Sequence, residues 1–189
     1  MSGSLLEGET PEPVSAATQL LAEYDSCFGL AGAPPVPVEE IARSLLVLWI
    51  DEADDLRTLP GAPADQGRLS GLLVPSELTV WLDRSEAARS RGRRRFTIAH
   101  EIGHFVLHAA RSQEAAISFC RGSDLERSDS IEGEANRFAA ALLMPEPLLE
   151  QEASSYGCNI SLLAERFAVS VPAMKLRLLT LNLLPAWMQ

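Results

Sequence analysis

The sequence has 189 residues, 47% of them hydrophobic, which is enough to bury one ordinary core and a small appended lobe. Its net charge of −10 and its pI of about 4.8 argue against a broad, non-specific grip on nucleic acid, which needs a basic surface. The three cysteines are widely spaced, and we find no signal peptide and no apolar run of about 18 residues, so we expect a soluble, cytoplasmic protein with reduced thiols and no membrane span.

The N-terminal part predicts a loose segment, two helices and a strand. Residues 1–13 are rich in Ser, Gly, Glu and Pro, a composition typical of loosely structured chain. Apolar residues recur at helical spacing in the segments that follow, and a short apolar run then indicates a buried strand. The expected elements are a helix at 14–28, a turn at 29–37, a helix at 38–45 and a strand at 46–51.

Two short apolar runs, 69–74 and 78–82, are separated only by the tripeptide PSE, a pattern that predicts a β-hairpin. If one strand of this hairpin lies at an edge of the sheet, a substrate peptide can add to it through backbone hydrogen bonds. A purely structural hairpin is the alternative.

Residues 84–95 carry six arginines and one acidic residue, Glu86, in an otherwise acidic chain. We expect these arginines either to be solvated or to pair with the acid-rich loop at 124–134. The other interpretation is that they grip an acidic stretch of a substrate. Further along, the long polar segment 111–130 is typical of an active-site rim.

The segment RRRFTIAHEIGHFVLH at 93–108 contains the pentapeptide HEIGH. Its flanking residues are almost all apolar, which predicts a buried helix. On that helix His100 and His104 lie about 6 Å apart along the axis and on one face, so two imidazole nitrogens can reach one ion. Buried polar groups are costly unless they are paired or bind a metal, and a set of hydrogen-bonded core histidines is the structural alternative.

An HExxH helix points to metal-assisted hydrolysis. The histidines hold Zn²⁺, and the glutamate, here Glu101, takes a proton from a water whose pKa the ion lowers to about 7. Two histidines leave a tetrahedral ion one protein ligand short, and a carboxylate commonly fills that position. We expect one Zn²⁺ per chain, although Mn²⁺ or Fe²⁺ can occupy the same ligands.

The third ligand is expected on a second buried helix at 131–145, which contains two glutamates. Glu132 and Asn136 are four residues apart and share a face, so Glu132 can bind the metal while Asn136 hydrogen-bonds to a ligating histidine. Glu134 lies about 200° around the helix from Glu132. We favour Glu132 because only it has the Asn136 companion, and Glu134 is the alternative.

Three further residues are candidates near the site. His108 lies one turn beyond His104, too far along the helix to bind the same ion, so it has either a substrate-side or oxyanion-stabilising role or a packing role at the helix end. Tyr156, which follows the second site helix, is another candidate oxyanion donor. Cys120 lies between the two site helices and either approaches the metal or is an ordinary thiol.

The C-terminal segment 160–184 shows two helical patterns joined near Val169 and Ser170, an arrangement that resembles a helix-turn-helix. Its charged residues make it only slightly basic, so we favour a packing or substrate-docking lobe over direct reading of DNA. Trp187 and Met188 either cap this lobe or contact another chain.

The segments RRFTIAHEIGHFVLH and EGEANRFAAALLMP closely resemble the ImmA/IrrE family of zinc metallopeptidases, most strongly over residues 68–145. The resemblance implies a small gluzincin-like fold in which His100 and His104 are ligands, Glu101 is the base and Glu132 is the third ligand. It also implies a protein substrate, since members of this family typically cut helix-turn-helix repressors encoded nearby and so relieve repression of stress-response or mobile-element genes. Residues 1–37 match no motif.

Together these features predict an α+β fold: a zincin-like metallopeptidase domain with a small, mostly antiparallel sheet, a buried HExxH helix and a C-terminal helix-turn-helix-like lobe. The expected division is an N-terminal extension at 1–37, the peptidase domain at 38–157 and the lobe at 158–189. The predicted function is zinc-dependent cleavage of a transcriptional repressor. The alternative is a non-catalytic, zinc-containing regulatory module that docks a repressor or DNA through its C-terminal helices, and an intact Glu101 favours catalysis.

Overall fold

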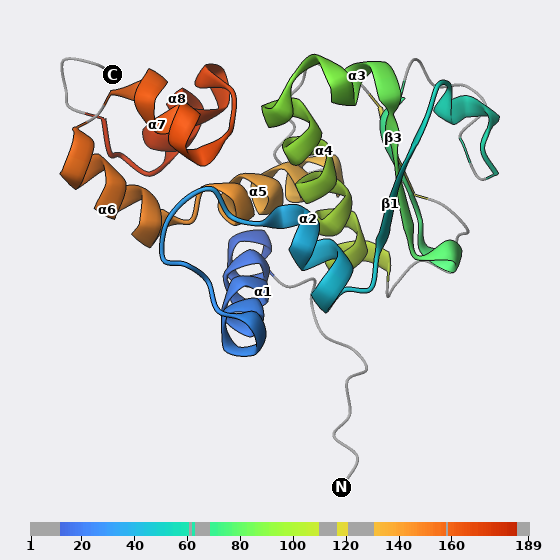
Figure 1. The fold of residues 1–189 in the computed structure, drawn as a ribbon, viewed down its shortest axis with the longest axis horizontal. Helices are drawn as coiled ribbons and strands as arrows, with labels where there is room; N and C mark the ends of the chain where they lie inside the picture. Colours follow the sequence, from blue (N-terminus) through green and yellow to red (C-terminus); the bar gives the residue numbers. More distant parts are fainter. Residues whose placement is uncertain are drawn as a thin grey trace, which may run out of the picture.

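The computed structural model describes residues 12–60, 62, 69–109, 117–120, 131–157 and 159–184. Figure 1 shows a small sheet on one side of the molecule, with α4 between the sheet and the helices α1 and α5. The last three helices are grouped on the opposite side. In the described part of the chain, none of the helices is long and apolar enough to cross a lipid bilayer.

The predicted N-terminal and site helices are all present. The helices are α1 (Pro13–Phe28), α2 (Val38–Glu40), α3 (Arg84–Arg89), α4 (Arg91–His104), α5 (Ile131–Leu143), α6 (Glu146–Tyr156), α7 (Ile160–Phe167) and α8 (Val171–Thr180). Two π-helical turns extend α2 and α4, at Ile41–Leu45 and Phe105–Ala109, and short 3₁₀ turns lie at Leu56–Thr58 and Pro75–Glu77. The helix expected at 38–45 is therefore α2 together with its π-helical turn.

The described strands are β1 (Trp49–Ala53), β2 (Leu69–Val74), β3 (Thr79–Asp83) and β4 (Ile117–Cys120), in the sheet order β1-β3-β2-β4. β2 and β3 form the predicted antiparallel hairpin, β2 also pairs antiparallel with β4, and β1 runs parallel to β3. The sheet is mixed and mostly antiparallel, and the fold belongs to the predicted α+β class. The expectation that the hairpin offers an edge strand is wrong, because both of its strands have neighbours on each side.

β1 differs from its prediction as a buried strand at 46–51. It begins at Trp49, whose side chain is 70% exposed, and it lies at an edge of the sheet. Val47 just before it adopts the left-handed backbone conformation, with φ 56°, which interrupts extended chain. The apolar run alone could not reveal the edge position, because a strand's neighbours come from distant segments.

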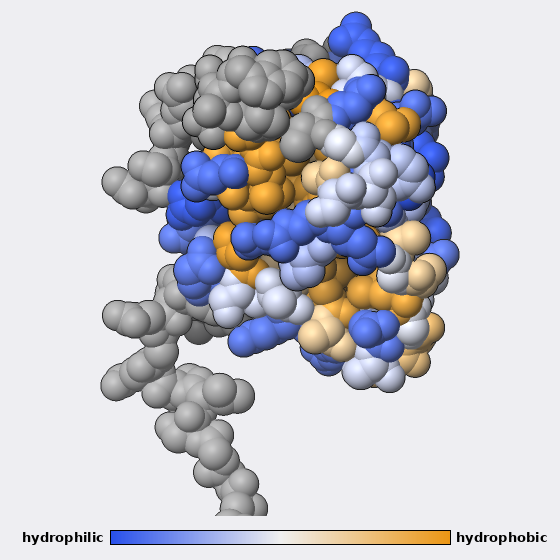
Figure 2. All heavy atoms as spheres, turned by 90° about the vertical axis from the view of Figure 1, so that its left-hand side faces the viewer, coloured by the Kyte–Doolittle hydropathy of each residue, from blue (hydrophilic) through white to orange (hydrophobic). Residues whose placement is uncertain are grey.

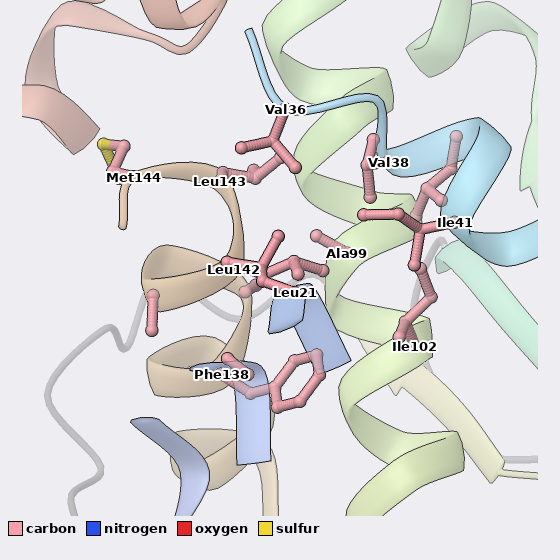
Figure 3. Close-up of a cluster of buried hydrophobic side chains, with 14 of the residues drawn as sticks. Leu21, Val36, Val38, Ile41, Ala99, Ile102, Phe138, Leu142, Leu143 and Met144 are labelled. Carbon is pink, nitrogen blue, oxygen red and sulfur yellow. The ribbon is translucent and has the colours of Figure 1, made fainter. Parts of the chain in front are cut away.

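The hydrophobic core lies around α4. Figure 3 shows Phe138 and Leu142 of α5 and Leu21 of α1 gathered on the side of α4 that carries Ala99. The same cluster of buried residues continues into the C-terminal helices through side chains such as Phe167, Met174 and Leu178. One continuous core therefore supports the site helices, and the division of the chain into three segments stays a prediction.

The C-terminal segment forms the two expected helices, α7 and α8, joined by a short turn in which Ala168 has a φ of 52°. The side chains of Asn159 and Ser170 accept hydrogen bonds from backbone amides at the two N-termini. α6, which precedes these helices, was not predicted. Its buried side is thin, with only Leu149 and Glu152 buried, so its periodicity is weak.

Within the described residues, the arginine-rich segment pairs with acids that the sequence analysis did not name, and most of the loop at 124–134 lies outside the description. Arg84 contacts Asp54 at 2.6 Å, and Arg94 pairs with Glu39 and Glu52. Glu86, the one acid of the segment, is buried between two of its arginines, with distances of 3.2 Å to Arg89 and 3.1 Å to Arg93. These ion pairs tie α3 and α4 to the N-terminal half of the fold. The pairing with the loop at 124–134 stays a prediction.

Several expectations fall outside the described residues. These are the loose segment up to residue 11, most of the polar segment 111–130, Cys158, Trp187 and Met188. Within the polar segment the structure describes only β4, a strand that the sequence did not predict, and the side chain of Cys120 lies outside the description.

Candidate metal centre and active site

α4 presents the HEIGH residues from the interior of the fold. Its first turn is capped by Ser90, whose hydroxyl accepts a hydrogen bond from the Arg93 amide. Its last turn carries His100, Glu101 and His104, each with no exposed surface. Helical spacing places both histidines on the face toward α5, as predicted.

α5 brings Glu132 to these histidines. One oxygen of Glu132 lies 3.3 Å from His100 Nε2, the other lies 3.5 Å from His104 Nε2, and the two Nε2 atoms are 2.9 Å apart. Ligands with bonds of about 2.0–2.1 Å to a tetrahedral ion lie roughly 3.3 Å from one another. The triangle therefore has the size that a tetrahedral Zn²⁺ site needs, and these three residues form the one potential metal-binding group among the described residues.

Asn136 occupies the position expected from its spacing to Glu132. The Nδ1–H group of His100 donates a hydrogen bond to Asn136 Oδ1 at 3.0 Å. A proton on Nδ1 leaves Nε2 of the neutral ring unprotonated, the form in which its lone pair can bind a metal. A side chain that fixes the tautomer in this way is a common companion of a ligating histidine.

The protonation states of the residues in the triangle also favour binding of a cation. Burial lowers the pKa of His100 to about 4, so its ring is neutral at pH 7. Burial alone would raise the pKa of Glu132, but the closeness of His100 and His104 outweighs burial and lowers that pKa to about 2. A neutral imidazole and an ionised carboxylate are the forms that bind a metal.

The Glu101 side chain is directed toward β2, about 60° around α4 from His104. Both of its carboxylate oxygens are buried, and no side chain in the described part of the chain hydrogen-bonds to them. Burial, followed by the negative charge of Glu132, raises the pKa of Glu101 well above its ordinary value, and the backbone of Leu73 opposes this shift. A buried carboxyl with an elevated pKa beside a candidate metal site is suited to accepting a proton near neutral pH.

His108 lies on the π-helical turn after α4, with its ring centroid 5.6 Å from that of His104. Its Nε2 atom is buried without a hydrogen-bond partner and lies 3.6 Å from Glu134 Oε2. Burial lowers the pKa of His108. Glu134, the alternative third ligand, thus faces His108 rather than the triangle.

Tyr156 is not brought to this cluster. It ends α6, is 48% exposed, and its ring lies 4.2 Å from the guanidinium carbon of Arg166 on α7. In Figure 1, α6 lies on the far side of the molecule from the sheet that packs against α4.

Sequence reasoning missed two glycines that border the site. A Cβ atom at Gly71 on β2 would lie 2.6 Å from Glu101 Oε1, and one at Gly103 on α4 would lie 3.2 Å from the Ala135 Cα atom of α5. A glycine inside a strand pattern is a signal of close approach, and the LSGLLV segment carried that signal.

The chain matches a family model over its second half. Residues 85–179, about half of the chain, match Peptidase_M78, described as the IrrE N-terminal-like domain. The matched region includes both site helices. No curated protein matches the chain.

A solved structure with a similar fold is a transcriptional regulator from Mycobacterium tuberculosis. It is 19% identical in sequence, with a TM-score of 0.57, and the match covers 87% of this chain and 46% of that chain. The chain therefore spans less than half the length of that regulator, and the likeness concerns the fold alone.

Proposed function

We propose that this chain, which belongs to the Peptidase_M78 family of IrrE N-terminal-like domains, is a zinc-dependent endopeptidase whose metal is held by His100, His104 and Glu132. The observation that carries the proposal is the closeness of this triangle to Glu101, whose buried carboxylate pairs with no side chain in the described part of the chain. A structural cluster would pair such a carboxylate with a cationic or hydrogen-bonding side chain.

The residues divide the chemistry of peptide hydrolysis between them. A bound Zn²⁺ ion would supply a Lewis acid, which lowers the pKa of water and polarises the carbonyl of a peptide bond. Glu101 accepts the proton of the attacking water and delivers it to the leaving amine nitrogen. Asn136 keeps His100 in the tautomer that has an unprotonated Nε2 atom.

His108 is the candidate for a hydrogen bond to the substrate carbonyl oxygen. It lies beside His104, its Nε2 atom has no hydrogen-bond partner, and no ligand position of the triangle requires it. In a neutral ring a protonated Nε2 can donate a hydrogen bond to a developing oxyanion.

The proposed substrate is a helix-turn-helix transcriptional repressor, whose cleavage would relieve repression of stress-response or mobile-element genes. The family assignment supports this class of substrate, and the description of the structural neighbour as a transcriptional regulator is consistent with it. Direct DNA binding is not part of the proposal. The chain has a net charge of −10, and the exposed residues of α8 include the apolar Val171 and Leu176.

The same surface argues for protein contacts at the C-terminal helices. Figure 2 shows apolar residues interspersed among hydrophilic ones on the side of the molecule where α6, α7 and α8 lie. Such a mixed surface is compatible with protein–protein contacts, whereas phosphate binding requires clustered basic residues. We therefore assign the C-terminal helices a packing and substrate-docking role.

The decisive experiment compares new protein N-termini across the proteome of host cells that express the wild type or Glu101→Gln. The variant should fold and bind zinc as the wild type does, because Glu101 is outside the triangle, but its cleavage rate should fall by about 10²–10⁴. New termini in a helix-turn-helix repressor that occur only with the wild type would identify both activity and substrate. If the variant keeps full biological activity, the chain acts as a docking module without turnover.

A further inference from the structure

α4 packs against β2 on one side and against α5 on another. Residues two positions apart on a helix point about 200° apart. Glu101 accordingly contacts β2, whereas Gly103 contacts α5, the helix that carries Glu132. The place of the base and the approach of the third ligand thus depend on two separate contacts of the same helix.

The contact with β2 passes through Gly71. A Cβ atom at this position would lie 2.6 Å from Glu101 Oε1 and 2.6 Å from Thr97 Cγ2, closer than real carbon contacts allow. The pairing of β2 with β4 is also irregular between Leu69 and Gly71. The carboxylate is the far end of a flexible side chain, so an added methyl group would move the carboxylate more readily than the backbone.

The contact with α5 passes through Gly103. A Cβ atom there would lie 3.2 Å from both the Cα and the carbonyl oxygen of Ala135, one helical turn from Glu132. These are backbone atoms of α5, so the helix itself would have to shift by a few tenths of an ångström. Metal–ligand distances tolerate deviations of only about 0.2 Å.

We propose that the two glycines are positioning residues with separate tasks: Gly71 sets the place of the Glu101 carboxylate, and Gly103 sets the distance of Glu132 from the two histidines. This proposal rests on the proposed function, since it assigns both contacts to the zinc site. If the glycines served packing alone, alanine at either position would change stability without separating the two properties.

The test compares Gly71→Ala and Gly103→Ala with a matched control, Gly92→Ala. Gly92 is also on α4, and a Cβ atom there would lie 3.1 Å from the backbone of Val169, so the control makes an equally close contact away from the site. Zinc affinity is measured by competition with a chromophoric chelator. The environment of Glu101 is measured by binding of acetohydroxamic acid to the Co²⁺-loaded protein, with Glu101→Gln as the reference. A hydroxamate binds a metal through two oxygens and directs a proton donor to a neighbouring carboxylate.

Gly71→Ala should keep its zinc affinity within about threefold of the wild type and lose at least about tenfold in hydroxamate affinity, as Glu101→Gln does. Gly103→Ala should lose at least about tenfold in zinc affinity and alter the Co²⁺ absorption spectrum. Gly92→Ala should change neither. If the two site variants behave like Gly92→Ala, or if both weaken zinc equally, the proposal is overturned.

Two further measurements separate failure of this proposal from poor folding of a variant and from failure of the proposed function. If Gly71→Ala folds poorly, the double variant Gly71→Ala/Thr97→Ala removes the clash with Thr97 and leaves only the one with Glu101. The double variant should then fold, keep its zinc affinity and still lose hydroxamate affinity, and unchanged hydroxamate binding would refute the role of Gly71. Failure of the proposed function has a different signature, because the wild type itself would then bind no zinc.

Discussion

Two pairs of helices, α4 with α5 and α7 with α8, share one hydrophobic core. They differ in whether their buried polar groups have hydrogen-bond partners. At and beside the HEIGH site, the Glu101 oxygens, His104 Nδ1 and His108 Nε2 are buried without a side-chain hydrogen-bond partner, and so is Arg95 Nε of α4. Around α7 and α8, the buried Arg177 donates to the carbonyl of Met144, and Arg166 pairs with the buried Glu152. No buried side-chain nitrogen or oxygen in the described part of α6, α7 and α8 lacks a partner.

The difference distinguishes residues that have a chemical role from residues that only stabilise the fold. An unsatisfied buried polar group costs roughly 1–3 kcal/mol, and more when it is charged. A fold that needed only stability would remove that cost, as the C-terminal helices do. Most of these unsatisfied groups lie at the HEIGH site, where under the proposed function a metal and a substrate would complete them.

Loss of the third ligand should give the largest effect. We expect Glu132→Ala to weaken zinc binding by at least about a hundredfold, because even outer-shell partners of a metal are worth about 10–100-fold. Chelator competition on the purified protein measures this change. Glu134→Ala is the matched control and should bind zinc as the wild type does, since Glu134 faces His108. Normal zinc affinity in Glu132→Ala, with loss in the control, would assign the third ligand to Glu134.

Asn136→Ala should weaken zinc binding by about 10–100-fold, since it removes the group that holds His100 Nδ1–H. The fold should survive, because Asn136 is only partly buried. Chelator competition gives the affinity, and circular dichroism checks the fold. Equal affinity in the variant and the wild type would mean that the tautomer of His100 needs no such partner.

Glu101→Gln should change the pH dependence of stability in the metal-free protein. The pKa of Glu101 is raised above its ordinary value of 4.5, so its contribution to stability is fully present below pH 4.5 and is lost as the pH rises through the raised pKa. Glutamine cannot ionise. The variant should therefore exceed the wild type in unfolding free energy by roughly 1–3 kcal/mol at pH 8, with a smaller difference at pH 4.5.

Urea unfolding of both proteins at the two pH values measures this effect. A difference of the same size at pH 4.5 and pH 8 would show that ionisation of Glu101 is not its cause.

The smallest effect is expected in the C-terminal helices, where a substitution should affect stability alone. Ser170→Ala removes the hydroxyl that caps α8 and should cost about 1 kcal/mol of unfolding free energy. Its zinc affinity should equal that of the wild type. A change in zinc affinity would break the distinction between the two helix pairs, because it would couple the cap of α8 to the metal site.

Much of the candidate site could be predicted because it depends on local helix geometry. The four-residue spacing from His100 to His104, and again from Glu132 to Asn136, fixes which side chains share a face before any tertiary contact forms. The boundaries of α1 and α5 followed from periodicity for the same reason. What sequence reasoning missed or misplaced depends on distant segments: the strand β4, the edge position of β1 and the acids that pair with the arginines.

The sequence by itself determined the chemistry: a histidine pair, a neighbouring glutamate and a second helix that offers two more carboxylates. The tertiary structure decided which carboxylate completes the triangle, since Gly103 lets α5 approach α4 closely at Ala135, and Glu132 then faces the histidines while Glu134 faces His108. It also decided where Glu101 is buried, through a strand that has no side chain at Gly71. Spacing along one helix is a property of the local chain, whereas the approach of two elements depends on small residues far apart in the sequence that meet only in the folded protein.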